Sequence, residues 1–235
     1  MSETSRRSTE NRILSSLPAA DYERLAPHLQ PIEFSRSERL YLVEERIEYV
    51  YFPVGSMISL VSQMADGASI EVGVVGFEGM AGLPFLLGVE RSPHETMAQI
   101  PGAAMRVSAE VLRAEFERGG ALQKRLLRYT QSLLLMTSQL AACNRLHHVD
   151  ERMARWLLMS YERCNCDELP LTQEFLAMML GVRRSGVTET AVVLQTDGYI
   201  NYRRGHISIL DRKGLEDVAC DCYDILKREF ERVAA

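Results

Sequence analysis

Residues 171–189 read LTQEFLAMMLGVRRSGVTE, and their pattern indicates two short helices joined by a tight turn. Thr172 is a favourable N-cap residue, and the apolar Leu171 and Leu176 lie at the two staple positions around it. Gly181 supplies the left-handed conformation that ends a helix. Only two residues follow before a second helix begins. Two short helices joined by a three-residue turn that contains glycine predict a helix-turn-helix.

A pair of short strands follows the second helix. Residues 200–202 and 207–209 have the composition of strands, and the sequence Arg203-Arg204-Gly205-His206 between them is typical of a tight hairpin turn. The segment from about Leu171 to Leu210 is therefore predicted to be a winged helix-turn-helix.

The distribution of charge indicates what this unit binds. The whole chain has a formal charge of −5, which by itself argues against nucleic acid as a partner. Residues 172–212, however, hold five arginines and only four carboxylates, and four of the arginines fall at the start of the second helix and at the wing tip. These are the two places where such a unit meets a DNA duplex.

Arg183 and Arg184 also oppose the dipole of the helix that they begin, at a cost of about 0.3–1 kcal/mol each. A paired violation of this kind favours a functional role over ordinary solvated charges. The predicted DNA-binding residues are Thr172, Arg183, Arg184, Ser185, Thr188, Glu189, Arg203, Arg204 and His206.

The first half of the chain has a different pattern of apolar residues. Between Ile32 and Val107, short apolar runs alternate with glycine and proline, and Ile70, Val72 and Val74 occupy every second position of one run. Period two bounded by turn residues predicts an antiparallel sandwich or roll. Residues 1–11 are polar and are expected to form a frayed tail.

A long helix is predicted from Ala121 to about Leu146. Its apolar residues form a narrow heptad seam, made of Leu122, Leu126, Tyr129, Leu133, Met136 and Leu140. A narrow seam favours the pairing of two helices, and the alternative is that the seam packs on the sheet of its own chain. The predicted fold is α+β, with an N-terminal roll domain at residues 1–120, a dimerisation helix at 121–147 and the DNA-binding domain at 148–235.

The stretch at 171–189 resembles the DNA-binding domain of the Crp/Fnr family of transcription regulators. The resemblance covers nearly the whole chain, includes residues 147–152 entering the next helix, and is strongest after residue 140. It implies that residues 1–120 form an effector domain, a roll of cyclic-nucleotide-binding fold, and that a homodimer forms through the long helix. It also implies a two-fold symmetric operator in double-stranded DNA, with the second helix of the motif in the major groove, and RNA polymerase as a further partner.

Individual residues agree with that family unevenly. Arg184 matches a family arginine that contacts bases, whereas Ser185 and Glu189 stand where glutamate and arginine are common. The resemblance therefore implies an operator of different sequence.

The effector site departs further from the family. Where the family reads Gly-Glu-Leu, this chain reads Gly79-Met80-Ala81-Gly82-Leu83, and Arg91-Ser92 follows. The effector-binding residues implied by the resemblance are Gly79, Met80, Gly82, Arg91 and Ser92. Because a methionine cannot accept a hydrogen bond from a ribose hydroxyl, cyclic AMP is not expected to bind in the usual mode. A different ligand and a roll without any small ligand both stay open.

The chain has five cysteines, an odd number, and most of them lie two residues apart, so a disulfide framework is not expected. The pairs Cys164/Cys166 and Cys220/Cys222 offer four thiolates to zinc or to redox sensing, but apolar packing explains them better. His147 and His148 with Asp150 and Glu151 are explained by a helix start. No metal and no cofactor are therefore predicted.

The remaining classes of function are less well supported. The chain has no phosphate-loop, nucleophile-elbow or His-Glu-x-x-His motif, so it is not expected to be an enzyme. It has no apolar run long enough for a membrane span and no signal peptide, so no membrane partner and a cytoplasmic location are expected. The alternative to a DNA-binding regulator is a signalling module whose winged domain contacts proteins.

Overall fold

The structure is a computed structural model that describes residues 10–164 and 166–233. Its first half holds α1 (Arg12–Ser15), α2 (Ala19–Leu25), η1 (Ala26–His28), β1 (Gln30–Phe34), β2 (Arg39–Tyr41), β3 (Tyr49–Pro53), β4 (Met57–Gln63), β5 (Ser69–Val75), α3 (Leu83–Leu86), β6 (Glu95–Ile100), β7 (Gly102–Ser108) and α4 (Ala109–Glu117). Its second half holds α5 (Ala121–Leu146), α6 (Val149–Arg163), α7 (Gln173–Leu180), α8 (Arg184–Thr196), β8 (Ile200–Arg203), β9 (His206–Ile209), α9 (Arg212–Val218) and α10 (Cys222–Val233).

The N-terminal half is an antiparallel roll, as the period-two pattern predicts. Its two sheets have the strand orders β1-β7-β3 and β2-β6-β4-β5, and all of their pairings are antiparallel. Apolar side chains from both sheets, such as those of Phe52, Ile58 and Val107, are buried in its core.

Strand β5 is covered on both faces, which the alternation in its sequence does not reveal. Ile70 and Val72 are only half-buried, whereas Glu71 is buried. Glu71 accepts a hydrogen bond from Trp156 Nε1 in α6 at 2.9 Å and one from Ser59 Oγ at 2.7 Å. The polar side of β5 thus faces the C-terminal half of the chain instead of water.

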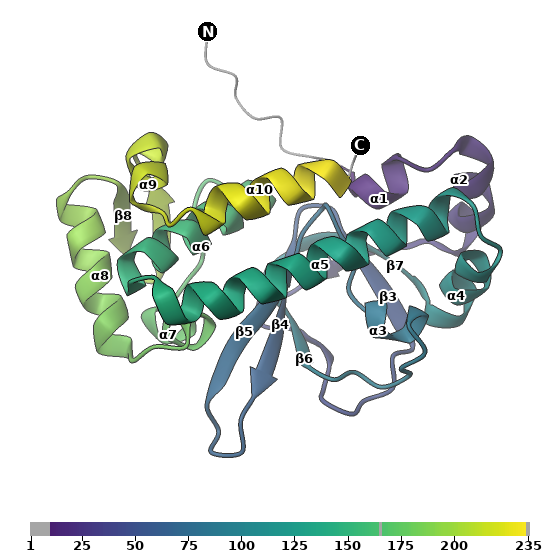
Figure 1. Cartoon of the computed structure of the whole chain (residues 1–235), viewed down its shortest axis with the longest axis horizontal. Helices are drawn as coiled ribbons and strands as arrows, with labels where there is room; N and C mark the ends of the chain where they lie inside the picture. Colours follow the sequence, from purple (N-terminus) through teal and green to yellow (C-terminus); the bar gives the residue numbers. More distant parts are fainter. Residues whose placement is uncertain (1–9, 165, 234–235) are drawn as a thin grey trace, which may run out of the picture.

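Helix α5 runs along most of the length of the molecule, and α10 lies beside it (Figure 1). The bounds predicted for the long helix are confirmed, but the predicted pairing seam is wrong. Leu126, Tyr129 and Met136 are fully buried within their own chain, and Tyr129 Oη donates a hydrogen bond to the Met80 carbonyl at 3.1 Å. The heptad spacing therefore reflects packing on the roll, because a period specifies a stripe and not what covers it.

Helix α6 joins the two halves. Its start is a capping box formed by His148 and Glu151, which agrees with the helix-start interpretation of this segment. Near its end, Arg163 forms a buried ion pair with Glu78 of the roll, with Nε 2.7 Å from Oε1. These contacts, with the Trp156–Glu71 hydrogen bond, fix the C-terminal half against the roll.

The polar N-terminal segment was expected to be frayed up to residue 11, and residues 1–9 lie outside the described part of the chain. Asn11 contradicts the expectation, because it is buried. Its Oδ1 accepts hydrogen bonds from the backbone of Ile13 and Leu14, and its Nδ2 donates to the carbonyls of Pro53 and Gly79. A single amide side chain thus caps α1 and anchors it to the roll.

Among the helices within residues 10–164 and 166–233, none has the length and hydropathy that crossing a bilayer requires.

Candidate nucleic-acid interface

The two helices of the motif begin and end where their sequence predicts. Thr172 caps α7, with its Oγ1 accepting a hydrogen bond from the Phe175 backbone at 3.2 Å. Gly181 ends α7 in the left-handed conformation, with φ of 62°. Arg183 is then the N-cap of α8 and provides no side-chain hydrogen bond to the helix. The α8 N-terminus therefore keeps free backbone donors beside two arginine side chains.

One face of α8 packs inward and the other is open. Val187, Ala191 and Leu194 are buried against the rest of the domain. Arg183, Arg184, Ser185 and Glu189 are not buried, as predicted; the side chain of Val192, farther along α8, is 58% exposed. Helix α8 lies at the end of the molecule away from α2 and α4 (Figure 1).

Thr188 is less free than its sequence position suggests. Its Oγ1 lies 2.9 Å from Gln173 Oε1 and 3.0 Å from the Arg184 carbonyl. The contact holds the starts of α7 and α8 together and orients the polar face of α8.

The wing is the two-stranded sheet of β8 and β9, in which Arg203 pairs with His206. Arg204 and Gly205 form its tip with φ angles of 51° and 79°. Both residues with positive φ match the turn type that a two-residue hairpin loop favours. Arg203, Arg204 and His206 are exposed at the end of the hairpin.

A hollow connects the helices to the wing. Arg184 from α8 and Arg204 from the wing both line it, together with Thr172, Gln173, Glu174, Tyr202 and Gly205. A second hollow on the other side of the wing is lined by Glu168, Asn201, Arg203, Arg204, His206 and Ser208.

The sequence did not single out Gln173 or Tyr202 as parts of this surface. Tyr202 Oη donates a hydrogen bond to the Leu171 carbonyl at 3.1 Å, which ties the wing to the start of α7. An aromatic residue in a short strand is ordinarily interpreted as core, so its composition gave no signal of this role.

This surface carries more unpaired positive charge than the net charge of residues 172–212 suggests. Arg212 forms ion pairs with Glu162 and Glu216 behind the motif. In the part of the chain that the structure describes, no carboxylate forms an ion pair with Arg183, Arg184, Arg203 or Arg204. Their charge is available to an anionic partner.

The residues implied as an effector site are not gathered in one place. A largely apolar cavity beneath α5 is lined by Met80 and Gly82, but not by Arg91 or Ser92. Arg91 Nη1 donates to the Glu44 carbonyl at 2.6 Å, and the buried Ser92 donates through Oγ to the His94 carbonyl at 2.7 Å.

Gly79, which the resemblance also places in the effector site, lies against the Tyr129 ring. A Cβ added at Gly79 would lie 2.4 Å from Tyr129 Cε2, so no side chain fits there. The polar side chains that do line the cavity are His94, Thr130 and Thr137.

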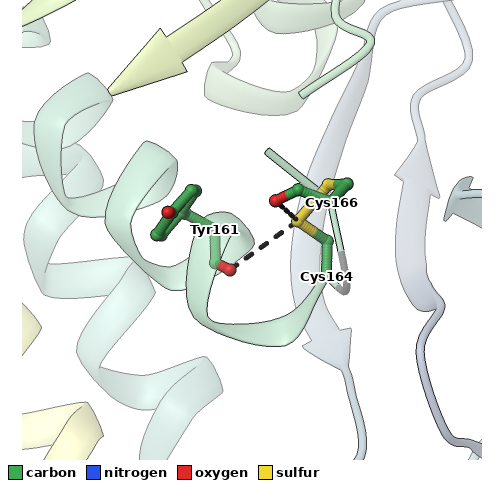
Figure 2. Close-up of a disulfide and its surroundings, with 3 residues drawn as sticks. All are labelled: Tyr161, Cys164 and Cys166. Carbon is green, nitrogen blue, oxygen red and sulfur yellow. Dashed lines mark hydrogen bonds between the residues drawn. A yellow bond between two sulfur atoms is a disulfide. The ribbon is translucent and has the colours of Figure 1, made fainter. Parts of the chain in front are cut away.

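Cys164 and Cys166 pack against the main hydrophobic core, and Cys220 and Cys222 lie in a small buried cluster, which agrees with the apolar packing expected from the sequence. Cys164 and Cys166 form a disulfide just after α6, next to the last turn at Tyr161 (Figure 2). The expectation that no disulfide framework exists did not anticipate this local bond, which closes a short loop with a Cα–Cα distance of 5.3 Å. The other pair, Cys220 and Cys222, lies beside Cys143 instead of beside the first pair.

Comparison with known protein families gives a match in the second half of the chain. A family model described as a Crp-like helix-turn-helix domain matches residues 151–218. A search of curated proteins finds no match.

Solved structures extend the likeness over most of the chain. A transcriptional regulator of the Crp/Fnr family from Eubacterium rectale is 18% identical, with a TM-score of 0.69, covering 89% of this chain and 99% of that chain. A CRP/FNR family regulator from Thermus thermophilus is 22% identical, with a TM-score of 0.65, covering 81% and 98%. The c-di-GMP responsive global regulator CLP from Xanthomonas campestris is 17% identical, with a TM-score of 0.63, covering 82% and 99%.

At these identities the structural likeness establishes the fold, and the family model establishes the nature of the C-terminal domain. The resemblance stated from the sequence is confirmed: the chain carries a Crp-like helix-turn-helix domain within the fold of the Crp/Fnr family of transcription regulators.

Proposed function

We propose that this chain is a transcription regulator that binds double-stranded DNA by inserting the polar face of α8 into the major groove. The observation that carries the proposal is the presence of four solvent-accessible arginines at the two contact points of a winged helix-turn-helix, with no carboxylate of the described chain neutralising them. A folded protein gains nothing by placing cations at a helix N-terminus, whereas a DNA duplex supplies the missing negative charge.

The start of α8 reads bases in this proposal. Arg184 has the reach and the two parallel donors to bind guanine O6 and N7, and Glu189 accepts from a cytosine amino group. Ser185 and Thr188 supply shorter polar contacts, and the exposed Val192 is placed to touch a thymine methyl group. A serine at 185 and a glutamate at 189 give this helix its own base preference.

The flanking elements hold the phosphates. Arg203, Arg204 and His206 lie on the wing, and Arg183 lies at the N-cap of α8. Thr172 and the free backbone N–H groups at the start of α7 offer a further anchor on the opposite side of the hollow. These contacts position α8 without selecting a sequence.

We further propose that the regulator is a homodimer formed through α5, but through a different face from the heptad seam. The buried seam is unavailable, whereas Leu127 and Leu134 are 49% and 58% exposed. Together with the exposed Ala141 they recur every seven residues along the helix. Two-fold pairing of α5 would present two copies of α8 to half-sites about 34 Å apart.

Selection of duplexes from a random pool by the purified full-length protein tests the proposed function, followed by mobility shifts on the selected sequence. We expect a two-fold symmetric consensus and a large loss of affinity in Arg184→Ala. Arg228→Ala is the matched control, because Arg228 is an exposed arginine on α10 away from the motif. Failure to enrich any sequence, or equal affinities for the two variants, would contradict the proposal.

Cyclic AMP is not expected to be the effector. Met80 is buried, and the nearest cavity is lined by no arginine, lysine or carboxylate of the described chain. Burial lowers the pKa of its His94, so this imidazole is uncharged at neutral pH. A phosphate would find little to neutralise it there. Calorimetric titration with cyclic AMP is expected to show no binding, and saturable heat at one site per chain would contradict this.

Contact with RNA polymerase and a cytoplasmic location complete the proposal. They follow from a role as a transcription regulator, in keeping with the Crp-like domain. No enzymatic step is part of this role. Co-purification of the operator-bound protein with RNA polymerase tests the first of them.

A further inference from the structure

Three thiols and an imidazole meet at the junction between α5 and the last two helices. Cys143 lies in the final turn of α5, and His147 is its C-cap residue. Cys220 lies just after α9, and Cys222 begins α10. One ligand atom from each of the four side chains lies within 4.8 Å of every other.

We propose that Cys143, His147, Cys220 and Cys222 form a tetrahedral Zn²⁺ site that ties the end of α5 to the connection between α9 and α10. Three cysteines and one histidine are a ligand set typical of closed, structural zinc sites. The chain supplies all four ligands, so no position stays open for a substrate.

The distances between ligand atoms suit a zinc ion. Bonds of about 2.3 Å to sulfur and about 2.0 Å to nitrogen, at tetrahedral angles, place two sulfurs roughly 3.8 Å apart and a sulfur and a nitrogen roughly 3.6 Å apart. The Sγ atoms of Cys143 and Cys220 are 3.6 Å apart, and Cys222 Sγ is 3.4 Å from His147 Nδ1. These two distances agree with tetrahedral zinc coordination to within a few tenths of an ångström, and the four ligand atoms all lie within 4.8 Å of one another.

The backbone explains why these side chains converge. Cys143 and His147 are four residues apart, and the His147 backbone N–H donates to the Cys143 carbonyl at 3.1 Å, so both side chains leave the same side of the helix end. Cys220 and Cys222 flank one residue at the connection between α9 and α10. All three cysteines are buried, and the His147 side chain is 27% exposed at the rim.

Groups around the four ligands hold them in a metal-binding orientation. The other ring nitrogen of His147, Nε2, lies 3.5 Å from Asp221 Oδ1, an arrangement that fixes the imidazole with Nδ1 toward the thiols. Gln139 Nε2 lies 3.1 Å from Cys222 Sγ and donates to it. Carboxylate–histidine–metal chains and donors to ligand sulfur are common features of zinc sites.

The charges nearby favour thiolates. Arg152 and Arg155 are both buried, and in the described part of the chain neither Nε has a hydrogen-bond partner. Both guanidinium groups interact electrostatically with the Cys143 sulfur. Three thiolates around Zn²⁺ carry one net negative charge, which two buried guanidinium groups are placed to balance.

The site links two parts of the molecule that the proposed function uses. It joins α5, the proposed dimerisation helix, to α9 and α10 of the DNA-binding half. If the proposed function holds, removing the metal should loosen the position of α8 relative to the dimer axis and weaken operator binding as well as lower the stability of the chain.

Metal analysis of untagged, full-length protein tests the site without DNA. Elemental analysis should give about one zinc per chain for the wild type and for the double variant Cys164→Ser/Cys166→Ser, which removes only the disulfide cysteines. Cys222→Ser should lose most of the zinc. Equal zinc content in Cys222→Ser and the wild type, or loss of zinc only in the disulfide variant, would overturn the proposal.

Cobalt substitution covers the case in which Cys222→Ser does not fold. Co²⁺ titrated into the metal-free wild-type chain should give the sulfur-to-cobalt charge-transfer band and the strong visible bands of tetrahedral thiolate coordination, saturating at one equivalent. A chain that holds neither zinc nor tetrahedral cobalt, or that takes up only copper(I), would refute the zinc site. A zinc-loaded chain that binds no DNA would refute the proposed function and leave the site standing.

Discussion

At the N-terminus of α8, Arg183 and Arg184 add positive charge where the helix dipole is already positive. The protein offers no compensating carboxylate in the described chain, and both side chains are accessible to solvent. The arrangement costs about 0.3–1 kcal/mol for each arginine in the free protein. It becomes favourable only when polyanionic DNA occupies the surface, so the residues with the least structural value are the ones that the proposed function needs most.

The base-reading and phosphate-binding arginines should be separable by experiment. Arg203→Ala should weaken binding to all sequences alike and reduce the slope of log affinity against log salt by about 1. Arg184→Ala should cost about 1–3 kcal/mol on the selected operator and relax specificity at one base pair of each half-site. Fluorescence anisotropy at several salt concentrations on operator and scrambled duplexes measures both; identical behaviour of the two variants would rule out this division of roles.

Glu71 shows what burial does to a single carboxylate. It lies between the roll and α6, where loss of solvation raises its pKa to about 7 in spite of hydrogen bonds from Ser59 and Trp156. The folded protein therefore favours the protonated form more than the unfolded chain does. The stability from this group is complete below its ordinary pKa near 4.5 and is lost as pH rises through about 7.

Replacing Glu71 with glutamine should remove this pH dependence. We expect the free energy of unfolding of Glu71→Gln, relative to wild type, to increase between pH 5 and pH 8 by an amount on the order of 1–3 kcal/mol. Denaturant unfolding at several pH values gives this difference. Glu231→Gln, at an exposed position on α10, is the control; a Glu71→Gln profile parallel to wild type would contradict the expectation.

At the scale of elements, local signals predicted the motif well. The helix cap at Thr172, the helix end at Gly181 and the hairpin of the wing each depend on interactions between residues close together in the sequence. The local sequence therefore specifies these features directly. The α5 seam failed because its spacing is the same whether a second subunit or the roll covers it. The contact between Cys143 and Cys220 could not be predicted from local sequence patterns because the two residues are 77 positions apart.

A cue to that convergence was nonetheless present. Cys143 and His147 are four residues apart in a predicted helix, which is a spacing that allows both to bind one metal ion. The sequence-based interpretation considered a metal at His147 only together with His148, Asp150 and Glu151. It did not connect His147 with Cys143 or with the Cys220/Cys222 pair.

The turn between α7 and α8 also depends on a contact that the sequence does not show. Gly181 has a positive φ, and a Cβ there would lie 2.5 Å from Ile70 Cδ1 of β5. Gly198, at the end of the α8 segment, has a positive φ but no neighbour within 4 Å of an added Cβ. An alanine at either position would introduce backbone strain, but only an alanine at Gly181 would also clash with a neighbouring side chain.

Gly181→Ala should therefore destabilise the chain more than Gly198→Ala does. Both substitutions incur about 1 kcal/mol of backbone strain, and the first adds a clash expected to cost roughly 1–3 kcal/mol. Adding Ile70→Ala should recover part of that difference in a double-mutant cycle of unfolding free energies. Equal destabilisation by the two alanines would show that the motif does not press on β5.

For the molecule as a whole, the pairing face of α5 determines how two DNA-binding domains are spaced. Leu134→Lys places a charge in the exposed row of Leu127, Leu134 and Ala141 without disturbing the core. We expect the variant to sediment as a monomer and to bind the two-fold symmetric operator far more weakly than wild type. Leu210→Lys is the matched control at an exposed leucine after the wing; a dimer that survives Leu134→Lys would place the interface elsewhere.

In the proposed complex, the polar face of α8, with the wing beside it, binds the DNA groove. The most direct measurement is the affinity of the full-length protein for its selected operator across a salt series, compared with the variant Arg184→Ala/Arg203→Ala. We expect an affinity that falls steeply with salt and is nearly abolished in the double variant at moderate salt. Affinity that is indifferent to salt and to both substitutions would contradict it.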